Sequence, residues 1–106
     1  MRTILMSIVA ITFSVTIMRA ADIGAGKTAY DTSCKSCHGA DGTANPAIAK
    51  MMKVDMQDLK SPAVRAMSDA DIKAVIANGK GKMHAVGSVS GTSADDVVSY
   101  VRSLKK

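Results

Sequence analysis

Cys34-Lys35-Ser36-Cys37-His38 is the stretch of sequence that decides the fold, and it contains both cysteines of this 106-residue chain. Two thiols at this spacing can reach the two vinyl-derived carbons along one edge of a porphyrin. The adjacent imidazole can then turn under the ring and bind the iron. The motif therefore predicts a site where one haem is covalently attached through Cys34 and Cys37, with His38 as an iron ligand.

An export signal is predicted ahead of the folded domain. Arg2 precedes a mostly apolar run from Ile4 to Met18, and small residues follow at Ala20 and Ala21. This is the layout of a secretory signal peptide, and the run is shorter than the ~20 residues that span a bilayer. We expect a signal peptide over residues 1–20, cleaved after Ala20 or Ala21, and a single domain over residues 21–106 without a membrane span. An uncleaved N-terminal anchor is the alternative. The expected compartment is the periplasm or an equivalent.

The core of such a domain is expected to be thin. Beyond residue 20 the only aromatic residues are Tyr30 and Tyr100. Domains of this size bury little apolar surface and often need an additional stabilising group. A covalently bound, largely apolar macrocycle would supply one. Methionines that can fill irregular core space occur at positions 51, 52, 56 and 67.

The charge of the chain does not favour nucleic-acid binding. Of its 14 basic residues, Arg2 and Arg19 lie in the predicted signal peptide, which leaves twelve against nine acidic residues. The basic residues neither cluster densely nor alternate with aromatic side chains that could stack on bases. We interpret most of the lysines as a solubilising surface.

Helical signals recur along the domain, and no alternation typical of strands is sustained. We expect one helix capped by Asp22. A second begins at the capping sequence Ser68-Asp69-Ala70-Asp71 and ends at Asn78-Gly79, and a last one is capped by Thr92 or Ser93. The last helix has an apolar stripe formed by Val97, Val98, Tyr100, Val101 and Leu104. The predicted fold class is all-α, with three main helices plus short turns and loops wrapped around one covalent haem.

This organisation resembles a class I monohaem c-type cytochrome of the small soluble bacterial class. The resemblance rests on the attachment motif directly after a first helix, a methionine in the glycine-rich loop Gly79-Lys80-Gly81-Lys82-Met83, and an amphipathic last helix. It implies the cytochrome c fold and one haem c. It also implies thioethers at Cys34 and Cys37, His38 as the proximal ligand and Met83 as the distal ligand.

Three structural roles are also implied by the resemblance. The carbonyl of Pro46 would accept a hydrogen bond from the second ring nitrogen of His38 and orient the imidazole. Gly26 would face Tyr100 where the first and last helices cross. Tyr30 would pack near this crossing.

The distal position has an alternative ligand. A soft thioether is a suitable ligand for haem iron, and methionine–histidine ligation raises the reduction potential. His84 stands where the family often has proline after the methionine. Ligation by His84 in place of Met83 would give bis-histidine iron with a lower potential.

The function we predict is one-electron transfer between redox partner proteins, without enzymatic activity, by a monomer. Lys35, Lys80 and Lys82 are candidates for steering an acidic partner. One alternative keeps the haem but makes the distal ligand labile, as in a gas sensor or a peroxidase-like centre. A dithiol oxidoreductase using Cys34 and Cys37 is disfavoured because no βαβ pattern is present. A zinc site is disfavoured because adjacent Cys37 and His38 are poorly spaced for tetrahedral coordination.

Overall fold

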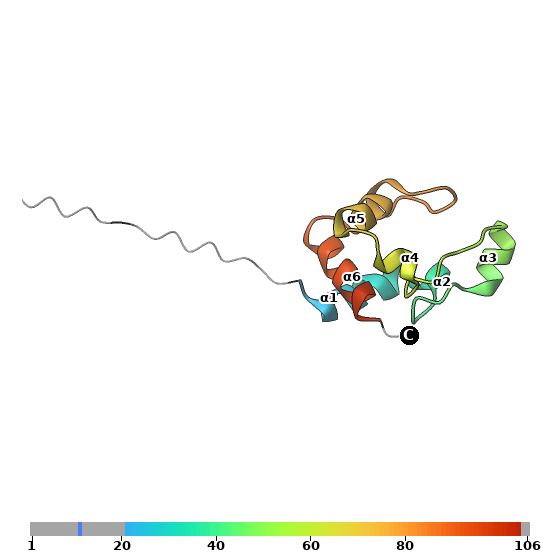
Figure 1. Cartoon of the computed structure of the whole chain (residues 1–106), viewed down its shortest axis with the longest axis horizontal. Helices are drawn as coiled ribbons and strands as arrows, with labels where there is room; N and C mark the ends of the chain where they lie inside the picture. The colour runs from blue at the N-terminus through green and yellow to red at the C-terminus, as the bar shows by residue number, and fades with distance from the viewer. Residues whose placement is uncertain (1–10, 12–20, 105–106) are drawn as a thin grey trace, which may run out of the picture.

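The structure, a computed structural model, describes residue 11 and residues 21–104, and these are entirely helical and irregular. The helices are α1 (Ile23–Ser33), α2 (Lys35–His38), α3 (Pro46–Met52), α4 (Pro62–Arg65), α5 (Asp69–Asn78) and α6 (Thr92–Ser103) (Figure 1). An isolated bridge joins Lys80 and Met83, and no longer strand occurs within the described ranges. The all-α prediction is confirmed, with α1, α5 and α6 as its three longer helices. The predicted signal peptide lies outside the described residues, apart from residue 11.

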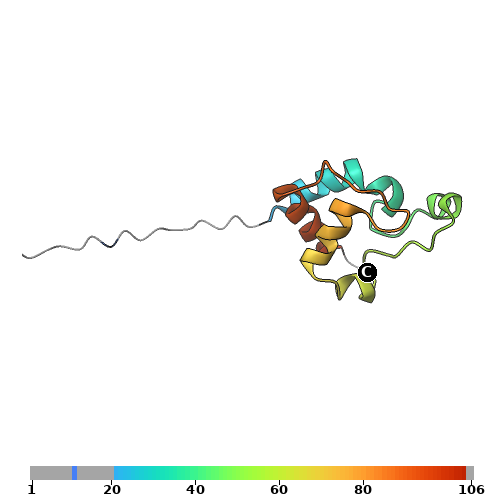
Figure 2. The ribbon, with the colours of Figure 1, turned by 90° about the horizontal axis from the view of Figure 1, so that it is seen from above.

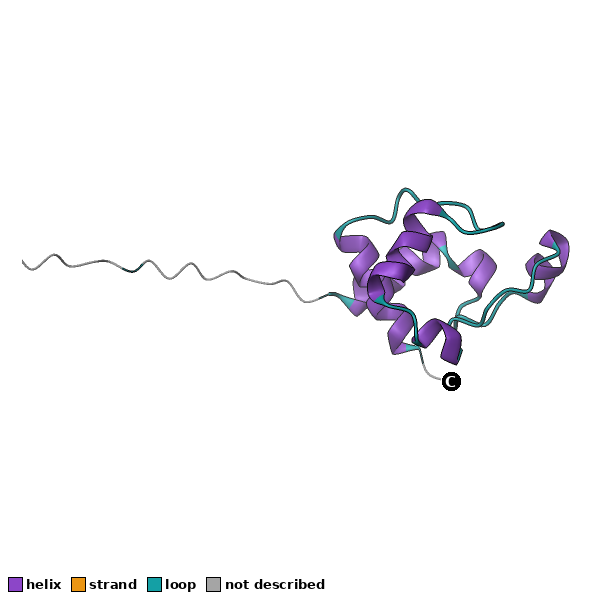
Figure 3. Ribbon diagram, turned by 45° about the horizontal axis from the view of Figure 1, so that its top comes forward, coloured by secondary structure: helices purple, strands orange, loops and turns teal. Residues whose placement is uncertain are grey.

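The first and last helices cross and form the centre of the fold, as Figures 1 and 3 show. Gly26 of α1 lies against α6: a Cβ atom at this position would overlap the carbonyl oxygen of Asp96 and lie 3.0 Å from the Cβ atom of Tyr100. Only a glycine lets the two backbones approach this closely. The predicted pairing of Gly26 with Tyr100 is therefore confirmed.

The hydrophobic core surrounds this crossing. Tyr30 is completely buried, and its ring meets the ring of Tyr100 edge to face, with centroids 5.1 Å apart. Edge-to-face pairing suits the quadrupoles of two aromatic rings. The other clustered buried residues are Ile76, Val89, Ala94, Val97, Val98 and Val101. The core is thus small, and most of it comes from α6.

We expect Gly26→Ala to destabilise the protein. The added methyl group meets a backbone carbonyl that cannot rotate away, so α1 and α6 must move apart. Overpacking of this kind costs about 1–3 kcal/mol, more than the ~1 kcal/mol that alanine gains over glycine in a helix. Gly24 is exposed and lies two residues before Gly26, on a different face of α1, where a Cβ atom would meet only the exposed Asp22 side chain, at 3.3 Å. Gly24→Ala is therefore the matched control and should leave stability unchanged or raise it. Chemical denaturation measures both, and equal stability of the two variants would contradict the close crossing.

The capping predictions are confirmed for two helices and wrong for the third. The Asp22 carboxylate accepts a hydrogen bond from the Ala25 amide at 3.1 Å, and the Ser68 hydroxyl accepts one from the Asp71 amide at 3.1 Å. The cap of α6 is Gly91, with a φ of 55°, and no side chain caps this helix. Ser93 instead closes the preceding turn, since its hydroxyl donates to the Ser90 carbonyl and accepts from the Ser90 amide.

Helix α3 stands apart from the other helices. It lies at the end of two extended connections in Figures 1, 2 and 3, and none of its residues is buried. Met51 on this helix is 71% exposed. The part of the fold that follows the attachment motif therefore has few protein contacts of its own. Among the described helices, none is long and apolar enough to cross a membrane.

Candidate haem site

The attachment motif lies at the junction of two helices. Cys34 ends α1 and begins α2, and the His38 amide donates to the Cys34 carbonyl at 2.9 Å. Residues three and four apart in a helical turn share a face, so Cys34, Cys37 and His38 are held on the same side of α2. The two cysteines form no disulfide with each other, and both are half-buried. This arrangement is compatible with attachment at two points and ligation by the histidine that directly follows the second cysteine.

His38 is half-buried, and burial lowers the pKa of its imidazole. A lowered pKa favours the neutral ring, which is the form that binds metals. Its Nδ1 atom is buried and has no hydrogen-bond partner in the part of the chain that the structure describes. An unpaired buried ring nitrogen is costly in a finished fold. The buried Nδ1 atom of His38 therefore indicates that this part of the site needs a further group or partner to be complete.

The thiol of Cys34 has the wrong environment for a dithiol catalyst. Burial, assisted by the neighbouring Cys37, raises the pKa of Cys34 above its ordinary value. Dithiol oxidoreductases lower the pKa of their attacking cysteine, because the thiolate is the nucleophile. The raised pKa therefore disfavours the oxidoreductase alternative. No group of three or more histidine, cysteine or acidic side chains among the described residues is placed to hold a metal ion.

Tyr30 connects the core to the motif. Its hydroxyl donates to the Gly39 carbonyl at 2.6 Å, directly after His38. Burial raises the pKa of this phenol, so it remains a hydrogen-bond donor at neutral pH. The sequence indicated Tyr30 as a packing residue of the helix crossing. The structure adds that it anchors the backbone on the C-terminal side of the histidine.

Asn45 connects the motif to α3, and sequence reasoning missed it. The backbone amide of Asn45 donates to the Cys37 carbonyl at 2.9 Å, and its side-chain NH₂ donates to the Ser36 carbonyl at 3.3 Å. Its side-chain oxygen accepts from the Ala47 amide at 3.1 Å and so caps α3. An Asn-Pro pair is a signature of a helix start, and this signal was available in the sequence.

Pro46 occupies the first turn of α3 and is exposed. A carbonyl at this place points along the helix toward the amide four residues later. The structure shows no hydrogen bond from His38 Nδ1 to Pro46. The orienting role of Pro46 therefore stays a prediction.

The loop that carries Met83 is shaped by a tight turn. The amide of Lys80 donates to the carbonyl of Met83, and the amide of Met83 donates to the carbonyl of Lys80, both at 3.0 Å. Gly79 has a φ of 77°, and a Cβ atom there would lie 2.9 Å from the Ala85 nitrogen. The chain thus folds back over Gly79, a position where only glycine avoids both strain and overlap.

Side chains next to Met83 distinguish the candidate ligands. Met83 is half-buried, whereas His84 is exposed. The ammonium of Lys82 donates to the Met52 carbonyl at 2.6 Å and so connects the loop to the end of α3. This contact brings Met52 close to the same loop. Burial therefore favours Met83 over His84, and the backbone contact makes Met52 a methionine to test as a competing ligand.

The Met83 loop and α2 lie on opposite sides of the same part of the molecule. In Figure 1 the orange loop after α5 runs along the upper edge and α2 lies below it, and in Figure 2 the two overlap when seen from above. Helix α3 lies beyond both. The loop after α5 and the helix that ends at His38 thus lie on opposite sides of this part of the molecule, and the half-buried cysteines are at the helix. Together with the unpaired Nδ1 atom of His38, this arrangement fits a covalently bound haem.

Comparison with known protein families gives a match over residues 21–101, to the family described as cytochrome c oxidase, cbb3-type, subunit III. The chain belongs to this family of c-type cytochromes. It is 30% identical over 92 residues to the cytochrome c-554(547) of Halothiobacillus neapolitanus, covering 81% of this chain and 100% of that protein. The solved structure of the KustC0563 c-type cytochrome superimposes with a TM-score of 0.64 at 25% identity, covering 76% of this chain and 98% of that one.

The family confirms several predictions. This cytochrome has the all-α cytochrome c fold, and its cofactor is covalently bound haem c. Proteins of this kind transfer electrons and work with redox partner proteins. The residues that attach and ligate the haem remain predictions for this chain, as does the export signal.

Proposed function

We propose that this cytochrome is a one-electron carrier in an exported compartment, the periplasm or its equivalent. In this proposal Cys34 and Cys37 carry the haem, His38 is the proximal ligand and Met83 the distal ligand. The observation that supports it most is the position of the Met83 loop opposite α2, because protein ligands from both sides leave no open coordination position. Haem held in this way supplies a reversible one-electron couple.

The residues around the motif keep the site rigid, which favours fast electron exchange. Two hydrogen bonds hold the backbone on either side of His38. Tyr30 donates to the Gly39 carbonyl, and the Asn45 backbone amide donates to the Cys37 carbonyl. The turn between Lys80 and Met83 fixes the backbone that presents the thioether. A site whose ligands do not rearrange between oxidation states needs little reorganisation. The export part of the proposal rests on the sequence of residues 1–21 alone.

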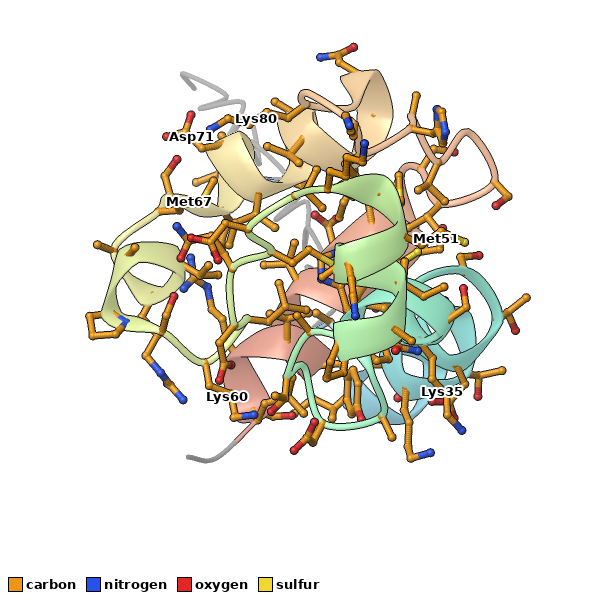
Figure 4. The ribbon with its side chains drawn as sticks, turned by 90° about the vertical axis from the view of Figure 1, so that its right-hand side faces the viewer. Lys35, Met51, Lys60, Met67, Asp71 and Lys80 are labelled. Atoms are coloured by element: carbon orange, nitrogen blue, oxygen red, sulfur yellow. The ribbon has the colours of Figure 1, made fainter. Side chains whose placement is uncertain are left out.

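One face of the cytochrome is suited to meeting an acidic partner. Figure 4 looks onto α3 and shows Met51 on this helix, with Lys35 and Lys80 on either side of it. Both lysines are exposed, and neither forms an ion pair within the described chain. By contrast, Lys73 pairs with Asp95 at 2.8 Å. We propose that Lys35 and Lys80, together with Lys82, attract a negatively charged partner to this face.

We expect the oxidation of the ferrous protein by ferricyanide, a small anionic oxidant, to slow as ionic strength rises. Screening shortens the range of electrostatic steering to about 10 Å at 0.1 M salt. Replacing both Lys35 and Lys80 by glutamine should lower the rate by about two- to tenfold at low salt and flatten the salt dependence. Stopped-flow absorbance measures both effects.

Lys73→Gln is the matched control for this experiment. It removes the same charge from a lysine that Asp95 already neutralises, so its effect on the rate should be small. A double variant with the same rate and salt dependence as the unmodified protein would show that Lys35 and Lys80 do not steer. Failure of ferricyanide to oxidise the protein at all would contradict the carrier function itself.

A further inference from the structure

Lys60 is a buried lysine that the haem site, as described so far, does not use. Its side chain is only 7% exposed, and its ammonium donates to the Asp41 carbonyl at 2.9 Å and to the Thr43 hydroxyl at 2.7 Å. Carboxylate oxygens of Asp41 and Asp58 lie 3.6 and 3.5 Å away. Lysine is almost never buried unless it is paired. All the partners of the ammonium lie in two segments, residues 41–43 and residue 58.

A second set of contacts joins the same two segments. The Leu59 amide donates to the Gly42 carbonyl at 3.0 Å. A Cβ atom at Gly42 would lie 3.0 Å from the Cβ atom of Leu59 and 2.9 Å from Cδ1 of Leu104, so the loop packs tightly here. The Lys60 carbonyl accepts from Arg65, whose guanidinium also donates to the Leu104 carbonyl. Residues 58–60 thus connect the 39–45 loop to the end of α6.

The 39–45 loop begins directly after His38. Gly39 is held by Tyr30, and Asn45 returns to the Cys37 carbonyl. The Nδ1 atom of His38 has no partner among the described residues. The His38 ring is attached to the backbone between Cys37 and Gly39, so its direction depends on how the backbone that follows it is held. That backbone is fixed at its two ends by Tyr30 and Asn45, and in its middle by Lys60.

We propose that Lys60 is a positioning residue for the proximal side of the haem: it fixes the middle of the 39–45 loop and thereby the orientation of the His38 ring. The proposal rests on the proposed role of His38 as an iron ligand. Lys60 acts through hydrogen bonds to the backbone and to Thr43, and its charge is balanced by the two nearby aspartates. Figure 4 shows Lys60 on the side of the molecule below α4, away from Lys35 and Lys80.

The test compares two variants of the holoprotein by NMR. Lys60→Met removes the donors and the charge, and the double variant Lys60→Met/Asp58→Asn removes the donors with the net charge unchanged. In both we expect amide hydrogen exchange at Leu59 and Asn45 to accelerate about tenfold or more, since a buried charge-assisted hydrogen bond is lost. We also expect the iron-shifted ring resonances of His38 in the ferric protein to move in both.

Arg102→Gln is the control for a loss of stability alone. Arg102 donates to Asp69 and to the Met67 carbonyl, both at 2.7 Å, and to the Arg65 carbonyl at 3.5 Å, and it forms no hydrogen bond with the 39–45 loop or with residues 58–60. This variant should unfold at lower denaturant concentration while the His38 resonances stay in place. If Lys60→Met also lowered stability but left the His38 resonances in place, Lys60 would only stabilise the fold and the proposal would be wrong.

The remaining outcomes separate the possible failures. If the double variant restores the His38 resonances, Lys60 acts through its charge and not through position, which overturns the proposal. If exchange accelerates but no His38 resonance is shifted by iron in any variant, His38 is not the ligand and the proposed function fails instead. Iron-shifted resonances that do not change in either variant would overturn the proposal while leaving the proposed function intact.

Discussion

Replacement of Met83 by alanine is expected to open the distal side of the haem. The ferric protein should lose the methionine-to-iron charge-transfer band, and the ferrous protein should bind carbon monoxide, which the unmodified protein should not. The reduction potential should fall, because methionine–histidine ligation raises it. A drop on the order of 0.1–0.3 V is reasonable within the ~0.8 V range that axial ligands span. Visible spectra and a potentiometric titration measure these changes.

Two controls make this result specific to Met83. Met52→Leu tests the methionine that the Lys82 contact brings near the loop, and His84→Ala tests the exposed imidazole beside Met83. Both variants should keep the band. Survival of the band in Met83→Ala and its loss in Met52→Leu would reassign the ligand. Absence of the band from the unmodified protein, with a change of spectrum in His84→Ala, would establish bis-histidine ligation.

Replacement of both cysteines by serine should have the largest effect on the fold. The buried hydrophobic residues of the described chain are few and mostly valines and alanine besides the two tyrosines. Helix α3 contributes none of them. A domain this small has little stability to spare, and a group bound only to the folded state adds its binding free energy to that stability. We expect the double variant to lose most of its helical circular dichroism at 25 °C.

Ser36→Ala is the matched control for this variant. Ser36 lies between the two cysteines, and its side chain is exposed, while the contact with Asn45 uses its backbone carbonyl. The control should therefore bind haem and fold as the unmodified protein does. Should the cysteine variant unfold cooperatively at an unchanged denaturant midpoint, the protein core would be sufficient on its own and haem would not be needed for folding.

Much of this fold could be predicted because its signals are local or covalent. The spacing of Cys34, Cys37 and His38 indicates haem whatever the fold around it. Asp22 and Ser68 cap their helices through bonds that span three residues. The prediction of a close crossing at Gly26 came from the family resemblance, and it is confirmed because α6 leaves no room for a side chain.

What could not be predicted depends on contacts between distant segments. Lys60 resembles the other lysines in the sequence, and its burial follows only from the oxygens that residues 41–43 and 58 bring together. The cap of α6 was predicted at Thr92 or Ser93 because serine and threonine favour such places. In the structure Gly91 takes a positive φ and Ser93 bonds to Ser90 instead. Local preference was outweighed there by the turn that precedes the helix.

The crossing of the first and last helices also sets the order in which this chain can fold. Six of the eight clustered core residues lie between Val89 and Val101. Tyr30 therefore has almost nothing to pack against until the C-terminal end of the chain has been synthesised. Contacts of such long sequence separation form slowly compared with local ones. We therefore expect the Cys34–His38 segment to stay accessible until α6 packs against α1.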